Sequence, residues 1–430
     1  MTDLQPHCTN WAGNLTYHAG QLDSPRTGDE LREIVRGSRK IRALGSRHSF
    51  NTIADSDTRQ VSLAHFDSID IDAAARTVSV GAGVRYGTLA PLLDAKEFAV
   101  HNLASLPHIT VIGAASTATH GSGVHNGNLA TAVSALEMVT ADGSVVHLSR
   151  KEHGDQFLGA VVALGSLGVV TRVTLDIVPR FEMTQVVYRG LSFDQLEHNL
   201  EAIFSAGYSV SLFTEWQDNR IAQVWIKDRA ASGQHARILP DFYGAKPATQ
   251  NMHPIEANSA ENCTEQLGVP GPWYERLPHF RMNFTPSNGA ELQTEYLLPR
   301  DRAYQAIRAV QSLADRIAPL LFITEFRTIA ADQLWLSTAY QRDSLAIHFT
   351  WKPTTPEVMA LLPQIEAKLA PFGARPHWGK LFTTPPAQLA ALYPRLADFR
   401  ALARHYDPDA KFRNEFVERK LFTLAPMGGL

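Results

Sequence analysis

The sequence predicts an α+β protein of two domains. A chain of 430 residues is longer than one ordinary hydrophobic core requires. Residues 1–180 show short strand patterns separated by glycine-rich turns, whereas the pattern lengthens after about residue 180. From residue 290 the order is strand, helix, strand, strand, helix, which is typical of an α+β layout.

The first part of the chain is predicted to contain few helices. A helix is expected at 29–36, after a Thr-Gly-Asp start. The Asp142-Gly143 pair predicts a hairpin, and Pro179 is expected to end the last strand. Strands are expected at 14–18, 41–44, 60–63, 77–80, 135–140, 145–148 and 169–178.

The second part is predicted to alternate helices and strands. Residues 229–290 are polar and rich in proline, and they give no clear pattern. Helices are expected at 193–206, 302–318 and 356–369, with a last helical region at 385–404. Strands are expected at 209–216, 221–227, 321–328 and 344–351.

Composition is that of an ordinary globular protein, with 44% hydrophobic and 19% charged residues. A net charge of −3 gives no basic surface for nucleic acid and no polybasic stretch for a membrane. Cys8 and Cys263 are expected to be unpaired thiols, and their spacing does not suggest a metal site. Without a signal-like start or a long apolar run, a soluble cytoplasmic protein is expected.

Two segments of small residues carry the strongest local signal. Residues 42–51 (RALGSRHSFN) follow a predicted strand, and residues 113–123 (GAASTATHGSG) consist almost entirely of Gly, Ala, Ser and Thr. Such segments let backbone N–H groups approach a diphosphate closely. Taken singly, each is more often a surface turn. Neither matches the Rossmann or Walker glycine pattern, so a different nucleotide-binding fold is expected.

These segments resemble the FAD-binding domain of the vanillyl-alcohol oxidase family. The similarity lies in the Gly-Ser-Arg-His-Ser-Phe-Asn run at 45–51, Thr-His-Gly-Ser-Gly at 119–123 and Leu-Gly-Ser-Leu-Gly-Val-Val at 164–170. Later segments resemble the sugar-lactone and alditol oxidase branch. The resemblance implies an FAD-binding domain at 1–180, a substrate-binding cap domain with an antiparallel sheet at 181–375, and a C-terminal segment at 376–430 that returns to the first domain.

The resemblance also implies that FAD is bonded covalently to His48 through its 8α carbon. On spacing alone, His48 is a surface or hydrogen-bonding histidine. No cysteine lies in residues 9–262, so a second, cysteinyl link is not expected. The other FAD contacts that the resemblance implies are Arg42, Ala43, Leu44, Gly45, Ser46, Arg47, Ser49, Ser105, Thr110, Gly113, Ala114, Ala115, Ser116, Thr119, Gly121, Val170 and His377.

Polar residues alternate along two predicted strands of the second part. Period two places Glu325 and Arg327 on one side of a strand, and His348 and Thr350 on one side of the next. If the strands are neighbours, the four groups share a face, although a solvent-facing sheet shows the same alternation. Glu-x-Arg followed by His-Trp-x-Lys at 377–380 is the paired signature of the branch. The resemblance implies that the substrate contacts Ser105, Glu325, Arg327, Thr350 and Lys380, with His348 beside them.

These residue types suit the oxidation of an alcohol. Arg327 and Lys380 can stabilise alkoxide character, and Glu325 balances their charge. Thr350 and Ser105 can both donate and accept hydrogen bonds to hydroxyl groups. Either Lys380 or His348 could serve as the base, and the sequence does not choose between them. No metal is expected.

The resemblance implies a monomeric FAD-dependent alditol oxidase, which oxidises the terminal primary alcohol of a small polyol to an aldose while O2 becomes H2O2. An aldono-1,4-lactone oxidase or dehydrogenase is the alternative, because it shares both motifs. A third possibility is a flavin- or nucleotide-binding protein without redox chemistry. Neither nucleic acid nor a membrane is an expected partner.

Overall fold

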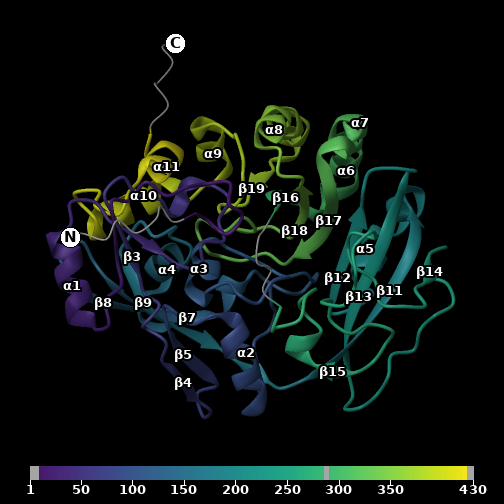
Figure 1. The fold of residues 1–430 in the computed structure, drawn as a ribbon, viewed down its shortest axis with the longest axis horizontal. Helices are drawn as coiled ribbons and strands as arrows, with labels where there is room; N and C mark the ends of the chain where they lie inside the picture. The colour runs from purple at the N-terminus through teal and green to yellow at the C-terminus, as the bar shows by residue number, and fades with distance from the viewer. Residues whose placement is uncertain (1–8, 285–289, 424–430) are drawn as a thin grey trace.

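The computed structural model describes residues 9–284 and 290–423, which form layers of mixed helices and sheets (Figure 1). Three sheets lie in the first part of the chain. A parallel sheet has the order β1 (Gln21–Asp23), β3 (Arg59–Ser62) and β2 (Arg42–Leu44). An antiparallel sheet has the order β4 (Ile69–Asp72), β5 (Thr77–Gly81), β9 (Val169–Asp176), β7 (Val133–Val139) and β8 (Val145–Ser149). A short pair joins β6 (Phe98–Ala99) to β10 (Val178–Pro179).

A nine-stranded antiparallel sheet dominates the second part. Its strands are β14 (Lys246–Pro247), β11 (Glu182–Ser192), β13 (Arg220–Ala230), β12 (Ser209–Thr214), β17 (Leu321–Ile329), β18 (Ser344–Trp351), β16 (Leu292–Pro299) and β19 (Arg375–Pro376), with β15 (Gly271–Pro272) also on β11. Each side chain of β18 is buried. Apolar side chains such as Ile347 and Phe349 pack into the main core on one side of the sheet, and the alternate, polar side chains lie buried on the opposite side.

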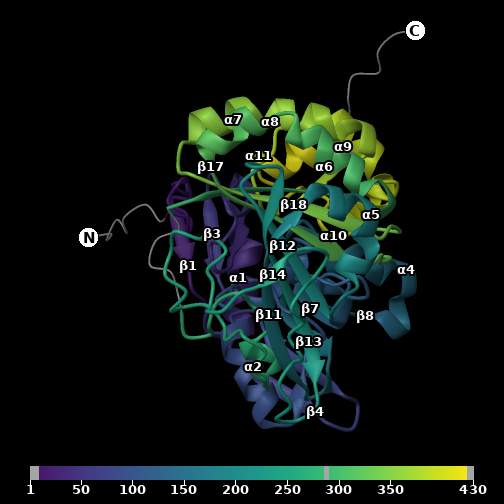
Figure 2. The same ribbon diagram turned by 90° about the vertical axis from the view of Figure 1, so that its right-hand side faces the viewer.

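Helices cover the outer faces of these sheets. In Figures 1 and 2, α5 to α8 lie along the outer side of the nine-stranded sheet. The helices are α1 (Gly28–Gly37), α2 (Tyr86–Ala95), α3 (Val111–Ser116), α4 (Arg150–Val161), α5 (Phe193–Phe204), α6 (Ala303–Gln311), α7 (Ala314–Ile317), α8 (Thr355–Leu369), α9 (Pro386–Leu392), α10 (Leu396–Tyr406) and α11 (Glu415–Val417).

The end of the chain returns to its beginning, where the residues after α10 contact the segment that contains β2. The backbone N–H of Ile41 donates to the carbonyl of Lys411 at 3.0 Å. The guanidinium of Arg42 donates to the carbonyls of Phe412 and Leu164 at 2.6 and 2.8 Å. Strand β2 is therefore fixed from both sides before the glycine-rich segment that follows it.

Most of the expected strands are confirmed, and the differences have physical reasons. Residues 14–18 form no strand; Thr16 makes one isolated bridge to Thr9, and the strand begins at Gln21 instead. The first part has more helices than expected. The sequence did not predict α2, α3 and α4, because these helices lack a clear amphipathic pattern. Residues 113–116 were expected in a loop but belong to α3. The helix expected at 302–318 is divided into α6 and α7, and the helical region at 385–404 into α9 and α10.

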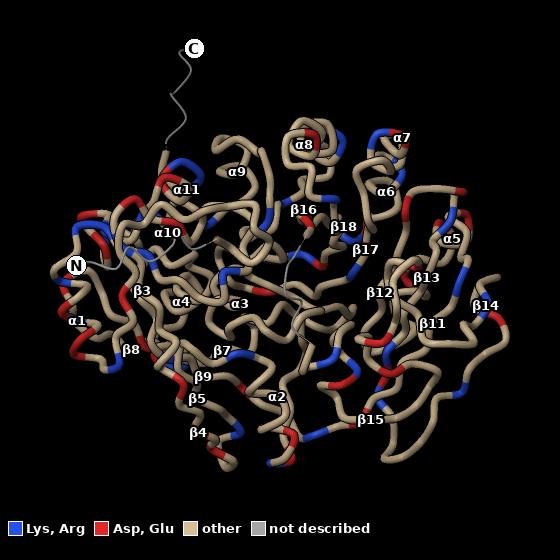
Figure 3. Tube along the Cα trace, in the orientation of Figure 1, with Lys and Arg blue, Asp and Glu red and all other residues tan. Residues whose placement is uncertain are grey.

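Charged residues of both signs are interspersed over the periphery (Figure 3). Within residues 9–284 and 290–423, no helix has the length and apolar character needed to cross a bilayer. In the same ranges, no cluster of His, Cys, Asp and Glu side chains has the arrangement of a metal site. Cys263 is a buried free thiol, whereas Cys8 lies outside the described residues.

Candidate active site

A cavity of about 780 Å³ lies where the first part of the chain meets the nine-stranded sheet. Its volume falls in the range of roughly 300–1,000 Å³ that ligand pockets occupy. Both segments of small residues line it, together with side chains from β16, β17 and β18. The loop at 253–258 and the residues His377, Gly379 and Lys380 also contribute to the lining. Segments that are far apart in the sequence therefore meet around one space.

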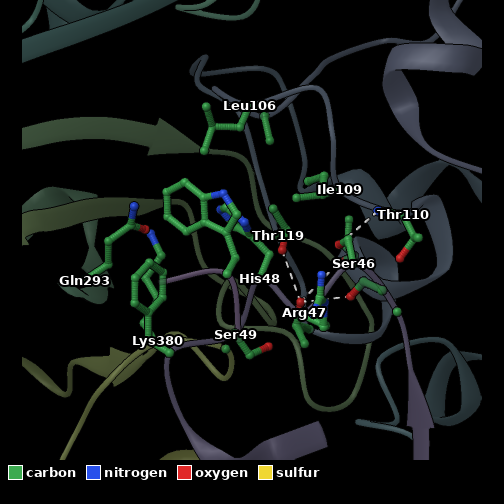
Figure 4. Close-up of a pocket in the computed structure, with 18 of the residues that line it drawn as sticks. Ser46, Arg47, His48, Ser49, Leu106, Ile109, Thr110, Thr119, Gln293 and Lys380 are labelled. Carbon is green, nitrogen blue, oxygen red and sulfur yellow. Dashed lines mark hydrogen bonds between the residues drawn. The ribbon is translucent and has the colours of Figure 1, made fainter. Parts of the chain in front are cut away.

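His48 lies in the middle of this lining, with Ser46 and Thr110 on one side and Lys380 on the other (Figure 4). The ring of Trp11 lies 4.3 Å from the His48 ring. Nδ1 of His48 is 3.2 Å from Nε2 of His108. Burial, together with His108 and Lys380, lowers the pKa of His48 to about 3. The imidazole is therefore neutral at physiological pH and has a nitrogen lone pair.

The cavity brings together most of the residues expected to contact FAD. Those that line it are Arg42, Ala43, Leu44, Gly45, Ser46, Arg47, Ser49, Ser105, Thr110, Gly113, Ala114, Ser116, Thr119, Val170 and His377. Ala115 and Gly121 are not in the lining. A Cβ at Gly121 would meet the carbonyl oxygen of Leu103 at 2.4 Å, so this glycine permits close packing of the chain. The Arg42 guanidinium is taken up by backbone carbonyls, and burial lowers its pKa to about 10.

The lining fits a large flat ligand with polar groups. A Cβ at Gly45 would lie 2.9 Å from Oγ1 of Thr110, and a Cβ at Gly113 would lie 2.6 Å from it. The absence of a side chain at both glycines therefore lets the backbone approach Thr110 closely at this wall of the cavity. Among the described residues, the buried Nε1 of Trp11 has no hydrogen-bond partner, and Nε of Arg327 makes no hydrogen bond and has only the Glu325 carboxylate 3.5 Å away. Such orphan donors are expected where a ligand supplies the acceptor.

Strands β17 and β18 are neighbours, and the four expected polar groups share one face. Glu325 is directly opposite His348 in the antiparallel register. Arg327 Nη1 donates to Ser105 Oγ at 3.4 Å, which joins the sheet to the first part of the chain. Glu325, Arg327, His348 and Thr350 are each 4–8% exposed and line the cavity. A solvent-facing sheet is therefore excluded.

Sequence reasoning did not identify Glu295, the buried counter-ion of this face. Its carboxylate accepts from Lys380 Nζ at 2.6 Å and from Arg327 Nη2 at 2.9 Å, and it lies 3.3 Å from His120 Nε2. Burial opposes its ionisation, but Lys380, His120 and Arg327 together hold the pKa of Glu295 well below its usual value. A charged residue inside the apolar strand at 292–299 was the signal in the sequence.

Lys380 also contacts His348. Its Nζ lies 2.7 Å from Nδ1 of His348, whose Nε2 is 3.1 Å from Oγ1 of Thr350. Burial and the charge of Lys380 lower the pKa of His348 to about 4. Burial also lowers the pKa of Lys380, while Glu295 opposes that shift. The face thus combines two cations, two carboxylates and a neutral histidine.

Comparisons with known proteins agree with this geometry. Residues 21–149 match the FAD binding domain family, and residues 286–420 match the D-arabinono-1,4-lactone oxidase family. The chain is 50% identical to the alditol oxidase of a Streptomyces species, over 95% of this chain and 97% of that protein. The chain belongs to the alditol oxidase family. It is an FAD-dependent oxidoreductase.

Two further proteins are similar to the chain at lower sequence identity. The L-gulono-1,4-lactone dehydrogenase of Mycobacterium tuberculosis is 28% identical, over 97% of this chain and all of that protein. Cholesterol oxidase from Brevibacterium sterolicum superimposes with a TM-score of 0.77 at 15% identity, covering 96% of each chain. That likeness shows the α+β fold expected from the sequence.

Proposed function

We propose that the chain oxidises the terminal primary alcohol of a small polyol to an aldose. The observation that carries this proposal is the pairing of Arg327 and Lys380 on one buried carboxylate at the cavity wall. Two cations beside one another favour alkoxide character at a bound hydroxyl. Glu325, Thr350 and Ser105 add acceptors and donors for the remaining hydroxyls of a polyol.

Lys380 and His348 together form the base in this proposal. The ion pair with Glu295 favours the ammonium form of Lys380, whereas burial keeps His348 neutral. Lys380 Nζ first passes one proton to His348 Nδ1, and the neutral amine that this leaves then accepts the hydroxyl proton, so the pair takes up one proton. Bound FAD supplies the hydride acceptor.

The proposal also covers the way in which the flavin is attached, the electron acceptor and the bounds of the domains. His48 holds the flavin covalently, supported by its neutral ring and its central place in the lining. O2 is the electron acceptor and leaves as H2O2. Residues 1–180 form the FAD-binding domain, 181–375 the cap, and 376–430 the returning segment, supported by the contacts of Lys411 and Phe412 with β2.

The test is to purify the protein, precipitate it with acid and record whether flavin absorbance stays with the pellet. Peroxide formation is then measured with xylitol and sorbitol. Flavin in the pellet and peroxide from polyol are expected, and His48→Ala should release its flavin on precipitation. A wild-type pellet without flavin refutes the covalent link, and absence of polyol turnover refutes the substrate.

A lactone oxidase or dehydrogenase is the second candidate, because the match at 286–420 is to a D-arabinono-1,4-lactone oxidase family. The same assay is therefore run with galactono- and gulono-1,4-lactone and with an artificial electron acceptor. Turnover of lactone without turnover of polyol would replace the first proposal with the second.

A further inference from the structure

A buried chain of three side chains runs from β13 to the cavity, whose lining includes two of them, His279 and Glu325. Lys227 lies on β13 and is 1% exposed. Its Nζ is 3.1 Å from Nδ1 of His279, and Nε2 of His279 is 2.8 Å from Oε1 of Glu325. Neither Lys227 nor His279 belongs to a sequence motif described above, and neither takes part in the proposed mechanism.

The contacts of Lys227 show where its three ammonium hydrogens point. Nζ donates to the carbonyls of Leu277 and Pro278 at 2.6 and 3.0 Å, and the third neighbour is Nδ1 of His279. An ammonium has three donors and no acceptor, so three acceptors satisfy it. Nδ1 of His279 must then accept, which places the ring proton on Nε2, where it is donated to Glu325.

Packing fixes the His279 ring in this orientation. The rings of Phe213 and Trp225 lie edge-on to it, at 5.5 and 5.2 Å. Burial and the charge of Lys227 lower the pKa of His279 to about 4, so the ring is neutral and has one N–H. One oxygen of Glu325 is occupied by this N–H, while Oε2 lies 3.5 Å from Nε of Arg327.

We propose that Lys227 and His279 are positioning residues that hold Glu325 ionised and in one orientation, and that they thereby determine how tightly the enzyme binds a polyol. The proposal rests on the proposed function, in which Glu325 accepts hydrogen bonds from substrate hydroxyls. A carboxylate free to rotate, or one facing a nitrogen lone pair, loses that fixed acceptor.

The chain also gives the affinity a dependence on pH. Burial lowers the pKa of Lys227 to about 7. The charges and thiol that act on it are those of Glu325, Cys263, Arg327 and Arg276, and His279 is its direct neighbour. Of these, Cys263 remains a thiol because burial raises its pKa to about 12.

Above pH 7 Lys227 becomes a neutral amine with two hydrogens and a lone pair. The two carbonyls take both hydrogens, so Nδ1 of His279 no longer receives one. The lone pair of the amine then faces the lone pair of Nδ1, and this repulsion displaces the ring whose Nε2 proton Glu325 accepts. KM for polyol should therefore rise as pH increases from 6 to 8.

Two matched variants of His279 test the positioning role. The amide nitrogen of Gln overlaps Nε2 of histidine, whereas that of Asn overlaps Nδ1. His279→Gln therefore keeps a donor for Glu325, and His279→Asn does not. With xylitol, KM should rise about tenfold in His279→Asn and less than threefold in His279→Gln, because one hydrogen bond to a charged group is lost only in the former. kcat should change less than threefold in either.

Lys227→Met provides the second test, with Lys246→Met, which alters an exposed ion pair with Asp241, as its control. Lys227→Met should have a high KM at every pH between 6 and 8, whereas the wild type and the control should show the pH-dependent rise. Anaerobic titration of the flavin absorption spectrum with xylitol gives the dissociation constant separately from turnover and should follow KM.

Several outcomes would overturn the proposal. Equal KM values for His279→Gln and His279→Asn would show that no oriented donor is needed. A wild-type KM that does not change with pH, or variants that lose flavin and thermal stability together, would make the chain a packing feature only. A wild type that neither binds nor oxidises xylitol would instead refute the proposed function.

Discussion

At the scale of the residue, Glu295 joins the cations of the site. It is 1% exposed and pairs with Arg327 and Lys380. Glu295→Gln leaves two buried positive charges with one counter-ion, Glu325. Removing one partner of a buried pair costs about 3–5 kcal/mol, so we expect a lower melting temperature and a loss of turnover.

The control for Glu295 is the exposed pair of Arg172 and Asp70, whose atoms are 2.6 Å apart. Asp70→Asn should change the free energy of unfolding by less than about 1 kcal/mol, because solvent screens a surface pair. Thermal unfolding and peroxide assays are run on both variants. Equal melting temperatures for the two would contradict the role of Glu295 as a buried counter-ion.

The proposed role of Lys380 in proton transfer predicts how its substitution changes kcat. Lys380→Met removes both a cation and the proton relay to His348, and kcat should fall by about 10²–10⁴. Lys368→Met, on the exposed side of α8, should retain wild-type kcat. Stopped-flow reduction of the flavin by xylitol measures the chemical step directly. A tenfold or smaller effect of Lys380→Met would remove it from the proton transfer.

The pKa of His348 predicts how kcat depends on pH. Because burial lowers that pKa to about 4, the ring is neutral above about pH 5 and ready to accept a proton. kcat should therefore be level between pH 6 and 8 and fall as the pH is lowered toward 4. Steady-state kcat across this range checks it, and a decline centred near pH 7 would require another base.

At the scale of the element, the sequence predicted the strands that carry the site. Period-two alternation was sufficient for Glu325 and His348, because β18 has one apolar face in the main core and the side of β17 opposite Glu325 packs Phe326 into the same core. It did not predict α3, whose run of small residues gives no amphipathic signal. His279 lies in an irregular loop, so its contact with Glu325 depends on a tertiary arrangement that no local pattern encodes.

The close packing of Gly159 in helix α4 against Trp335 leads to a prediction about stability. A Cβ at Gly159 would come within 2.4 Å of the Trp335 ring, which also donates from Nε1 to Asp155 at 3.1 Å. Gly159→Ala should therefore lower stability by about 1–3 kcal/mol through overpacking. Gly37→Ala, at the end of α1 where a Cβ meets no atom within 4 Å, is the control. Chemical denaturation measures both, and equal stability would show that Trp335 moves aside freely.

At the scale of the whole molecule, the site forms only because distant segments converge. Ser105 from the first part of the chain and Arg327 from β17 both line the cavity, and their hydrogen bond joins these two parts. Motif resemblance identified both residues, whereas the convergence itself depends on packing between parts of the chain more than 200 residues apart. The returning segment contributes to this packing through its contacts with β2.

Asp407 organises the returning segment and gives the prediction at this scale. It is 0% exposed, and its two carboxylate oxygens accept from the backbone N–H groups of Lys411 and Phe412 at 2.6 and 2.9 Å. The carbonyls of Lys411 and Phe412 in turn accept from Ile41 and Arg42.

In Asp407→Asn, an amide NH2 must face one of those N–H groups. A buried donor left without an acceptor costs about 1–3 kcal/mol, so the melting temperature should fall. The glycine-rich segment after β2 should loosen with it, which lowers flavin content per protein. The exposed Asp409→Asn should change neither quantity. Loss of stability with full flavin content would show that the returning segment supports the fold without shaping the cofactor wall.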